Sequence, residues 1–422
     1  MTTVLTSQSL ARLLVGWQDS GRGPAYERLA MVTAALLLDG RLLPRTRLPA
    51  ERDLAHALGV SRTTVTAAYA RLRADGFLLS RQGAGSWTVL PARPSRSLTP
   101  LGFRPDGDPD DGSLDLAIAA PGPVPELLGG AVEEAGRLFA AELARAGMGT
   151  TSAGHGYYPA GLPMLRDAIA ARFTARGLPT TPEQILVTAG AMGAVHLAGR
   201  RLLSGRDVAL VEQPTYPNAV DALRRTGTRL VGLPVSSDGW DPDLLAAAFA
   251  QARPRVAYMI PDFQNPTGAL LGVDGRERLL AAARAAGSVV LCDESLVDLP
   301  LDGQELPPPL AAFDSDDRVV TVGSLSKAVW GGLRVGWLRG RPRLIEELAA
   351  ERSTVDLAGP VYEQYLAAVV LDGLDALLPA RRADLASRRD LLVEALTSRL
   401  PDWRWRKPGG GLALWVRLEA PM

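Results

Sequence analysis

Residues 323–337 read GSLSKAVWGGLRVGW, and this stretch indicates most clearly how the larger part of the 422-residue chain is built. Lys327 follows an apolar, β-like run and lies among small residues, with Ser324 before it and Arg334 seven residues after it. A lysine held close to the backbone and partly desolvated is suited to covalent chemistry with an aldehyde. Hydroxyl and guanidinium groups are good donors for a phosphate. A lone lysine would be an ordinary surface charge, but this cluster favours a phosphorylated, aldehyde-bearing cofactor.

A glycine-rich junction earlier in the chain fits the same kind of ligand. In QILVTAGAMGAVHLAGRRL, residues 184–202, a strand-like run meets a helical run at Gly190. The backbone amides around Gly190, Ala191 and Met192 are therefore free to hold a phosphate at the N-terminus of a helix. Small residues also permit close packing of strand and helix, so the junction alone is a weak indication.

Two polar residues lie where the ring of such a cofactor would need partners. Asp293 ends the apolar run SVVLCDE, residues 288–294, where a carboxylate can meet a protonated ring nitrogen. Asn265, in YMIPDFQNPTG at residues 258–268, carries an amide that can bond a ring oxygen. Pro266 and Gly268 alone would indicate only a turn.

Strand-like runs alternate with helical stretches rich in alanine, leucine and arginine throughout this part of the chain. This alternation predicts an α/β body with a mainly parallel central sheet. The runs expected as strands are QILVTAG (184–190), DVALVE (207–212), RVAYMI (255–260), SVVLCDE (288–294), RVVTVGS (318–324) and RVGWLRG (334–340).

In their order, these motifs resemble those of fold-type I aminotransferases, over residues 114–422. The resemblance implies pyridoxal 5′-phosphate as the cofactor, with Lys327 as the lysine of the Schiff base. It also implies that Asp293 binds the pyridine nitrogen and Asn265 the 3-oxygen, and that Tyr216, in QPTYPNAV, stacks on the ring. The residues that it assigns to the phosphate are Ala191, Met192, Ser324 and Arg334, and Gly190 is expected to bind the cofactor with them.

The same resemblance implies a homodimer with shared sites. Tyr157, in GYYPAG, corresponds to a tyrosine that reaches the phosphate in the neighbouring subunit. Ordinary packing is the alternative interpretation for Tyr157 and Tyr216.

Two features depart from the aminotransferase pattern. Ser295 stands two residues after Asp293, where the family commonly has a tyrosine that bonds the 3-oxygen. The chain ends at PGGGLALWVRLEAPM, before the segment that in aminotransferases carries the arginine for the substrate carboxylate. We therefore expect either an incomplete small domain or altered substrate recognition.

The N-terminal part of the chain has a localised positive charge. The whole chain is neutral, with 46 basic and 46 acidic residues, so any attraction to nucleic acid must be local. Residues 41–93 hold nine arginines against three acids, which suits a phosphate backbone. Those arginines are Arg41, Arg45, Arg47, Arg52, Arg62, Arg71, Arg73, Arg81 and Arg93.

The periodicity of this part predicts a helix-turn-helix followed by a hairpin. Helical spacing covers residues 26–39, 52–58 and 63–74, and FLLSRQGAGSWTVL at 77–90 has a glycine-bearing middle between two β-prone runs. Gly59 permits a tight turn, and Ser61 is the expected N-cap of the recognition helix.

The stretch LPAERDLAHALGVSRTTVTAAYARLRADGFLLSRQGAGSWTV, residues 48–89, resembles the GntR-type winged-helix family. The resemblance implies a double-stranded DNA operator as partner and a wing tip at residues 81–85. A solvated helix face is the alternative for any single arginine. The expected DNA contacts are Arg52, Ser61, Arg62, Thr63, Thr64, Arg81 and Gly83.

Together these parts predict a DNA-binding domain at residues 1–90, a linker rich in proline, glycine and aspartate at 91–113, and the cofactor-binding body at 114–422. This arrangement resembles the MocR subfamily of GntR-type regulators. The resemblance implies a regulator that senses pyridoxal phosphate, or its adduct with an amine or amino-acid effector, as a head-to-tail homodimer.

Two other functions remain open from the sequence. One is a working aminotransferase with an attached DNA-binding domain, although Ser295 and the missing arginine speak against catalysis. The other is a body that only dimerises, against which the retained cofactor residues speak.

The remaining composition bears on the cellular setting. Cys292 is the only cysteine, which excludes an intrachain disulfide, and no long apolar segment is present. We expect a cytoplasmic protein without a membrane partner and without a metal site.

Overall fold

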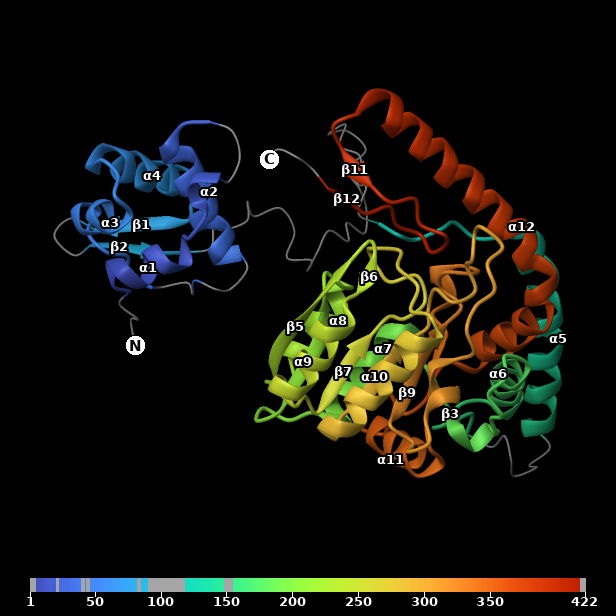
Figure 1. Ribbon diagram of the computed structural model, residues 1–422. Coiled ribbons are helices and arrows are strands. Elements are labelled where there is room, and N and C mark those ends of the chain that lie inside the picture. Colours follow the sequence, from blue (N-terminus) through green and yellow to red (C-terminus); the bar gives the residue numbers. More distant parts are fainter. Residues whose placement is uncertain are drawn as a thin grey trace. The chain divides into compact units, whose positions relative to one another are not determined.

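The computed structural model describes residues 5–19, 23–38, 42, 46–81, 85–89, 118–147 and 155–417. The chain divides into two compact units, one formed chiefly by Met1–Thr99 and the other by Pro100–Pro401 with Trp405–Val416 (Figure 1). The linker expected at residues 91–113 lies outside the described residues. So do Gly83, Arg41, Arg45 and Arg93.

The N-terminal unit is a small helical domain closed by a two-stranded hairpin. Its three expected helices and its hairpin are confirmed to within a few residues, and α1 is an additional helix that the periodicity did not indicate. Leu10 of α1 is fully buried, so this helix completes the core of the domain. The elements are α1 (Ser7–Leu13), α2 (Ala25–Leu38), α3 (Glu51–Leu58), α4 (Arg62–Ala74), β1 (Leu78–Arg81) and β2 (Gly85–Thr88).

The turn between α3 and α4 follows from two residues. Gly59 ends α3 in the left-handed conformation, with φ of 66°, which a glycine adopts without steric cost. Ser61 caps α4, and its Oγ accepts a hydrogen bond of 3.1 Å from the backbone N–H of Thr64. The predicted turn and cap are therefore confirmed.

The body is built on one mixed sheet of eight strands, in the order β3-β10-β9-β8-β7-β4-β5-β6. The five central strands β9, β8, β7, β4 and β5 are mutually parallel, whereas β10 runs antiparallel to both of its neighbours. The strands are β3 (Ile185–Thr188), β4 (Val208–Gln213), β5 (Arg229–Ser236), β6 (Gly239–Trp240), β7 (Val256–Met259), β8 (Val289–Asp293), β9 (Val319–Ser324) and β10 (Gly336–Arg339).

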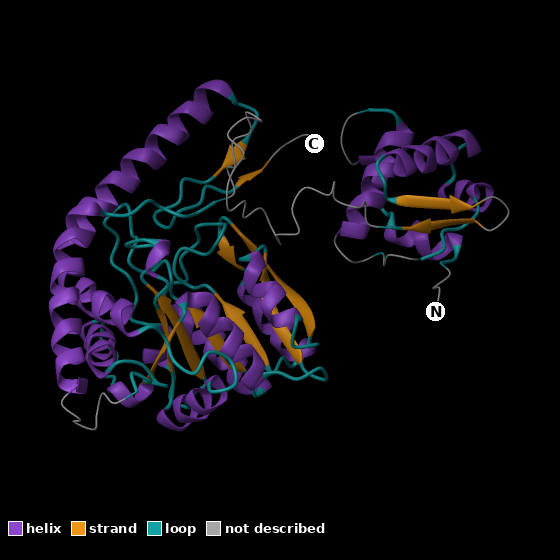
Figure 2. Ribbon diagram, turned by 180° about the vertical axis from the view of Figure 1, so that it is seen from behind, coloured by secondary structure: helices purple, strands orange, loops and turns teal. Residues whose placement is uncertain are grey.

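Helices cover both faces of this sheet (Figures 1 and 2). Alternate residues of the central strands enter one of two buried apolar clusters, as Tyr258 and Met259 of β7 do. One face is covered by α7 (Gly190–Leu202), α8 (Pro217–Arg224) and α11 (Pro342–Arg352). The other is covered by α5 (Pro125–Gly147), α6 (Pro163–Ala175), α9 (Pro242–Ala252), α10 (Val273–Ala286) and α12 (Val361–Arg399).

A short pair of strands, β11 (Arg404–Trp405) and β12 (Val416–Arg417), follows α12. The expected α/β body with a mainly parallel sheet is confirmed, and so are the six strands expected from the sequence. Strands β5, β6, β11 and β12 were not expected.

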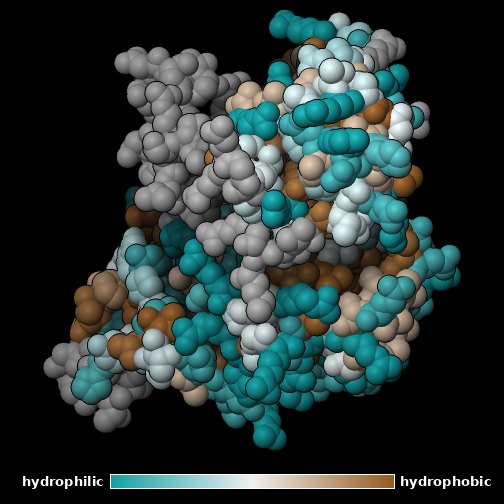
Figure 3. All heavy atoms as spheres, turned by 90° about the vertical axis from the view of Figure 1, so that its left-hand side faces the viewer, coloured by the Kyte–Doolittle hydropathy of each residue, from teal (hydrophilic) through white to brown (hydrophobic). Residues whose placement is uncertain are grey.

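Hydrophilic side chains dominate the face shown in Figure 3, with hydrophobic ones scattered between them. Among the helices of the described residues, none is both long enough and apolar enough to cross a membrane.

Candidate functional site

A large cavity of the body, about 820 Å³, lies at the edge of the sheet where the parallel strands end. Tyr216 follows β4, Asn265 follows β7, Asp293 is the last residue of β8 and Lys327 follows β9. Because β10 is antiparallel, its start lies at this same edge, and Arg334 just before it also lines the cavity. The fold thus brings to one cavity residues that are more than one hundred positions apart in the sequence.

The carboxylate of Asp293 is held from two sides. Its Oδ2 accepts a hydrogen bond of 2.7 Å from the hydroxyl of Tyr258, and its Oδ1 accepts one of 2.9 Å from the backbone N–H of Ser295. Burial, with the nearby Asp293 carboxylate, raises the pKa of Tyr258 well above its ordinary value, so its hydroxyl remains a donor. Asp293 is therefore fixed in orientation. The sequence analysis did not identify Tyr258, which looks there like a core aromatic.

Lys327 is half-buried, and its Nζ donates a hydrogen bond of 2.6 Å to the backbone carbonyl of Ala119. Burial lowers the pKa of Lys327, while the carboxylate of Asp293 acts in the opposite direction. A lowered pKa increases the fraction of neutral amine, which is the nucleophilic form. This environment suits a lysine that reacts with an aldehyde.

The N-terminus of α7 and Arg334 form a polar corner of the cavity. Ala191 and Met192 in the first turn of α7 line it, and the Nη2 of Arg334 donates a hydrogen bond of 3.2 Å to the carbonyl of Ala189. A Cβ atom on Gly190 would lie 3.2 Å from that Nη2, so the arginine packs directly on the glycine. Arg334 has a φ of 52°, a strained conformation that is concentrated at binding sites. Amides and a guanidinium are therefore presented together, as an anion requires.

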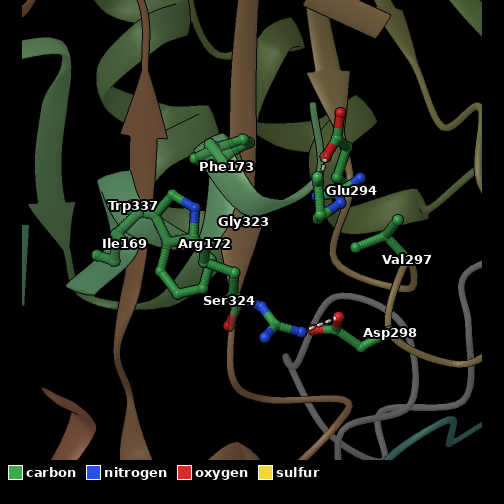
Figure 4. A pocket seen from close by; sticks show the side chains of 10 residues that line it. Ile169, Arg172, Phe173, Glu294, Val297, Asp298, Gly323, Ser324 and Trp337 are labelled. Carbon is green, nitrogen blue, oxygen red and sulfur yellow. Dashed lines mark hydrogen bonds and ion pairs between the residues drawn. The ribbon is translucent and has the colours of Figure 1, made fainter. Parts of the chain in front are cut away.

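The two serines beside Lys327 have different environments. The Ser324 hydroxyl donates a hydrogen bond of 3.1 Å to the carbonyl of Val335 and lies in a second, much smaller pocket of about 20 Å³ (Figure 4). That pocket has room for about one water molecule. Ser326 lines the large cavity instead. Ser324 is therefore not among the residues that line the large cavity, whereas Ser326 is.

Charged pairs surround the small pocket of Figure 4. The guanidinium of Arg172 pairs with Asp298 at 2.5 Å, and that of Arg176 pairs with Glu294 at 2.8 Å. These pairs connect α6 to the chain that directly follows Asp293, at the end of β8.

Asn265 belongs to a loop that is anchored at a buried carboxylate. Glu212 accepts hydrogen bonds from the backbone N–H of Ile260, from Gln264 Nε2 at 3.1 Å and from Trp240 Nε1 at 2.9 Å. Gln264 also donates to the carbonyl of Pro214, two residues before Tyr216. The loops that carry Asn265 and Tyr216 are thereby fixed to each other.

Two further residues named in the sequence analysis, Ser295 and Tyr157, differ in their relation to the cavity. Ser295 lines the cavity, and its buried Oγ has no hydrogen-bond partner among the described residues. Tyr157 is not among the residues that line the cavity, and 65% of the surface of this residue is exposed.

In the N-terminal unit, the residues expected at a DNA surface lie at and near the start of α4. Arg52, Ser61, Arg62 and Thr63 are exposed and Thr64 is half-buried. The Ser61 Oγ lies 2.7 Å from the Thr63 hydroxyl and 2.8 Å from that of Thr64.

The expected wing is the β1–β2 hairpin, in which the backbone of Arg81 pairs with that of Gly85. The side chain of Arg81 is outside the described part of the structure, as is the whole of Gly83.

The two units thus define a class of protein: a winged helix-turn-helix joined to a fold-type I aminotransferase-like body. Residues 131–421 match the aminotransferase class I and II family, and residues 25–87 match the gntR family of bacterial regulatory proteins. The chain belongs to both families and, by this pairing, to the MocR subfamily of helix-turn-helix transcriptional regulators.

Similar proteins share the whole arrangement. The probable rhizopine catabolism regulatory protein MocR of Rhizobium meliloti is 31% identical over 396 residues, which are 90% of this chain and 78% of that protein. The helix-turn-helix regulator YisV of Bacillus subtilis, described as uncharacterized, is 30% identical over 95% of this chain and 86% of its own length. The regulator TauR of Rhodobacter capsulatus is 31% identical, with 94% and 84% covered.

Solved structures match the body. The α-aminoadipate aminotransferase LysN of Thermus thermophilus, complexed with N-(5′-phosphopyridoxyl)-L-leucine, is 30% identical with a TM-score of 0.62, covering 70% of this chain and 75% of that one. The kynurenine aminotransferase of Pyrococcus horikoshii, in complex with PMP, is 27% identical with a TM-score of 0.62, and 72% and 76% are covered. The members of this aminotransferase family use pyridoxal phosphate.

Proposed function

We propose that the protein is a DNA-binding transcription regulator whose body holds pyridoxal 5′-phosphate on Lys327 and uses it to sense an amine or amino-acid effector. The observation that carries this proposal is the meeting of Lys327, Asp293, Asn265 and Arg334 around one cavity in a chain that also has a gntR-family domain. The proposal includes action in the cytoplasm, where the DNA is.

The residues fit this cofactor in their chemistry. Asp293 offers a fixed carboxylate to the ring nitrogen, Asn265 an amide to the 3-oxygen, and Tyr216 an aromatic face. The amides of Ala191 and Met192, with Arg334, offer donors to the phosphate. When bound, the cofactor supplies an aldehyde that condenses reversibly with primary amines and a ring that withdraws electrons.

The close approach of backbone at the polar corner is a second sign of fit. A Cβ atom on Gly336 would lie 2.5 Å from the carbonyl carbon of Gly190, so β10 and the start of α7 pack without side chains between them. A side chain on Gly336 would therefore displace the start of α7, whose first-turn residues Ala191 and Met192 line the cavity.

The exposed position of Tyr157 supports a homodimer in which this residue serves the cavity of the partner subunit. A head-to-tail arrangement, as the resemblance implies, would give each cavity one residue from the other chain.

Absorbance of the bound cofactor tests the central claim. Purified protein incubated with pyridoxal phosphate should show a band of lysine-bound cofactor, and borohydride reduction should attach the cofactor to the peptide that contains Lys327. Lys327→Ala should lose both signals, and Lys407→Ala, which removes an exposed lysine of the same body, should keep them. A band of equal strength in Lys327→Ala would show that the assignment is wrong.

The aminotransferase alternative keeps specific support, because the body resembles working enzymes over most of its length. Incubation with amino acids and keto acids distinguishes the two functions. Multiple turnovers with an ordinary amino acid would favour the enzyme, whereas binding without turnover favours the sensor.

A further inference from the structure

A short segment of the body lines the same cavity as Lys327 and is in contact with that lysine. Residues 119–122, here named the strap, all line the large cavity and lie in neither a helix nor a strand. The strap precedes α5, and on its other side the chain leads through residues 90–117 to the DNA-binding unit. Any change in how the strap is held therefore acts on the end of the segment that connects the two units.

Two side chains from distant parts of the sequence hold the strap. Lys327 Nζ donates to the Ala119 carbonyl at 2.6 Å, and Arg381 Nη2, from α12, donates to the Gly122 carbonyl at 2.9 Å. The same Nη2 lies 3.5 Å from the carbonyl of Val329, two residues after the lysine. The strap is thus anchored at one end by the proposed cofactor lysine and at the other by an arginine that also contacts the lysine loop.

The bond to Ala119 is incompatible with the covalent chemistry of Lys327. When the neutral amine condenses with an aldehyde, a C=N bond forms and the aldehyde oxygen leaves as water with both hydrogens of the nitrogen. The linked nitrogen keeps no hydrogen, or a single one when it is protonated, and that one would be shared with the ring oxygen next to the aldehyde carbon. None is then left for the Ala119 carbonyl. A carbonyl that loses its donor must turn to solvent or find another partner, because an unsatisfied polar group is costly.

We propose that the position of the strap depends on the covalent state of Lys327. The free lysine holds the Ala119 carbonyl by a hydrogen bond, and attachment of the cofactor to the lysine releases it. The anchor at Arg381 persists in both states, so release is confined to the end of the strap that faces the connecting segment. This inference rests on the proposed function, since it requires that Lys327 binds the cofactor. It adds a physical mechanism by which attachment of the cofactor to Lys327 could change the chain segment between the two units.

A single label can follow the strap because the only native cysteine, Cys292, is fully buried. Ala120 is exposed, so Ala120→Cys supplies one accessible thiol for a nitroxide spin label on the full chain. In cofactor-free protein we expect a largely immobilised spectrum. Addition of pyridoxal phosphate should convert the immobilised component into a mobile one, in proportion to the lysine-bound absorbance band of the same sample.

Two variants of Lys327 separate the loss of the hydrogen bond to Ala119 from the attachment of the cofactor. Lys327→Ala removes the donor, so the label should be mobile before any cofactor is added. Lys327→Arg keeps a donor for the Ala119 carbonyl but forms no linkage to an aldehyde, so its label should remain immobilised when pyridoxal phosphate is added.

The outcomes distinguish this inference from the proposed function. An absorbance band with an unchanged label spectrum overturns the strap inference and leaves cofactor binding intact. A label in Lys327→Ala that is as immobile as in the parent overturns it as well, without reference to the cofactor. Absence of any band in the parent overturns the proposed cofactor and, with it, the inference.

Discussion

At the scale of single residues, the contact between Tyr258 and Asp293 decides how the cavity presents its carboxylate. Both side chains are buried, and the hydroxyl donates at 2.7 Å to one carboxylate oxygen while a backbone amide serves the other. A hydrogen bond to a buried charged group contributes about 1.5–3 kcal/mol. Tyr258 is thus a positioning residue for Asp293 and is not among the residues that line the cavity.

Tyr258→Phe removes that donor with little change of shape. We expect it to lower the free energy of unfolding of the cofactor-free protein by about 1–3 kcal/mol, because a buried carboxylate loses a partner. With cofactor, we expect an upward shift of the pH at which the lysine-bound absorbance band titrates, since a more basic Asp293 draws the proton from the ring nitrogen. Tyr365→Phe, whose hydroxyl donates to Glu142 at 3.3 Å, is the control. A titration in Tyr258→Phe identical to that of the parent would contradict the positioning role.

Glu212 gives a pH dependence of stability. Burial raises its pKa to about 7, against the opposing effect of its hydrogen bonds from Gln264, Ile260 and Trp240. Below pH 4.5 the carboxyl is protonated in both the folded and the unfolded state. Between pH 4.5 and 7 only the unfolded state ionises, so stability falls as the pH rises, by up to about 3 kcal/mol, and then stays level.

Glu212→Gln should remove this decrease. The measurement is the free energy of unfolding from denaturant titrations at several pH values between about 4.5 and 8. Glu277→Gln, on the exposed side of α10, should retain the slope of the parent. An equal slope in Glu212→Gln and the parent would mean that another group is responsible.

At the scale of elements, the sequence predicted most of the strands and helices whose apolar residues follow a clear pattern. The six strands expected from apolar runs are all present because each is buried on both faces between helices. Strand β5 was missed because it is only partly buried and contains Pro234, which weakens any strand pattern. Helix α1 was missed because seven residues hold too few turns to show a period.

The cavity residues that belong to a local sequence motif were predictable. Residues that contact them only through the pairing of neighbouring strands were not. Asp293 ends β8, and Asn265 and Lys327 belong to motifs that follow β7 and β9, so the sequence motifs indicated residues that the structure brings to one cavity. Tyr258 reaches Asp293 only through the parallel register of β7 and β8, which no local pattern encodes. Which of Ser324 and Ser326 faces the large cavity likewise depends on the direction of one loop.

The start of α4 offers a test in which folding and DNA binding are separable. Ser61→Ala removes the side-chain cap and should lower the stability of the N-terminal unit by about 1 kcal/mol. Ser61→Asp keeps a capping oxygen, so we expect stability close to that of the parent, but its negative charge should weaken binding to DNA. Thermal unfolding and a binding titration on the same samples provide the comparison. Tight DNA binding by Ser61→Asp would place this helix start away from the phosphates.

At the scale of the whole molecule, the division of charge explains how a neutral chain can bind DNA. The chain as a whole carries no net charge, so the attraction must come from the arginines of the N-terminal unit. The body, in contrast, uses its buried arginines internally, as Arg276 does with Asp262 at 2.5 Å. Changes in one unit should therefore leave the chemistry of the other unaffected unless the connecting segment transmits them.

Arg62→Ala tests this division. Arg62 is exposed at the first position of α4, so we expect weaker binding to duplex DNA from the region around the gene, and a salt dependence whose slope is smaller by about one. The lysine-bound cofactor band should be unchanged, because no cavity residue is altered. Arg343→Ala, which removes an exposed arginine of α11 in the body, is the matched control and should bind DNA as the parent does. If both variants lose the same affinity, the effect is one of total charge, and the recognition helix does not lie where the sequence and the exposed start of α4 indicate.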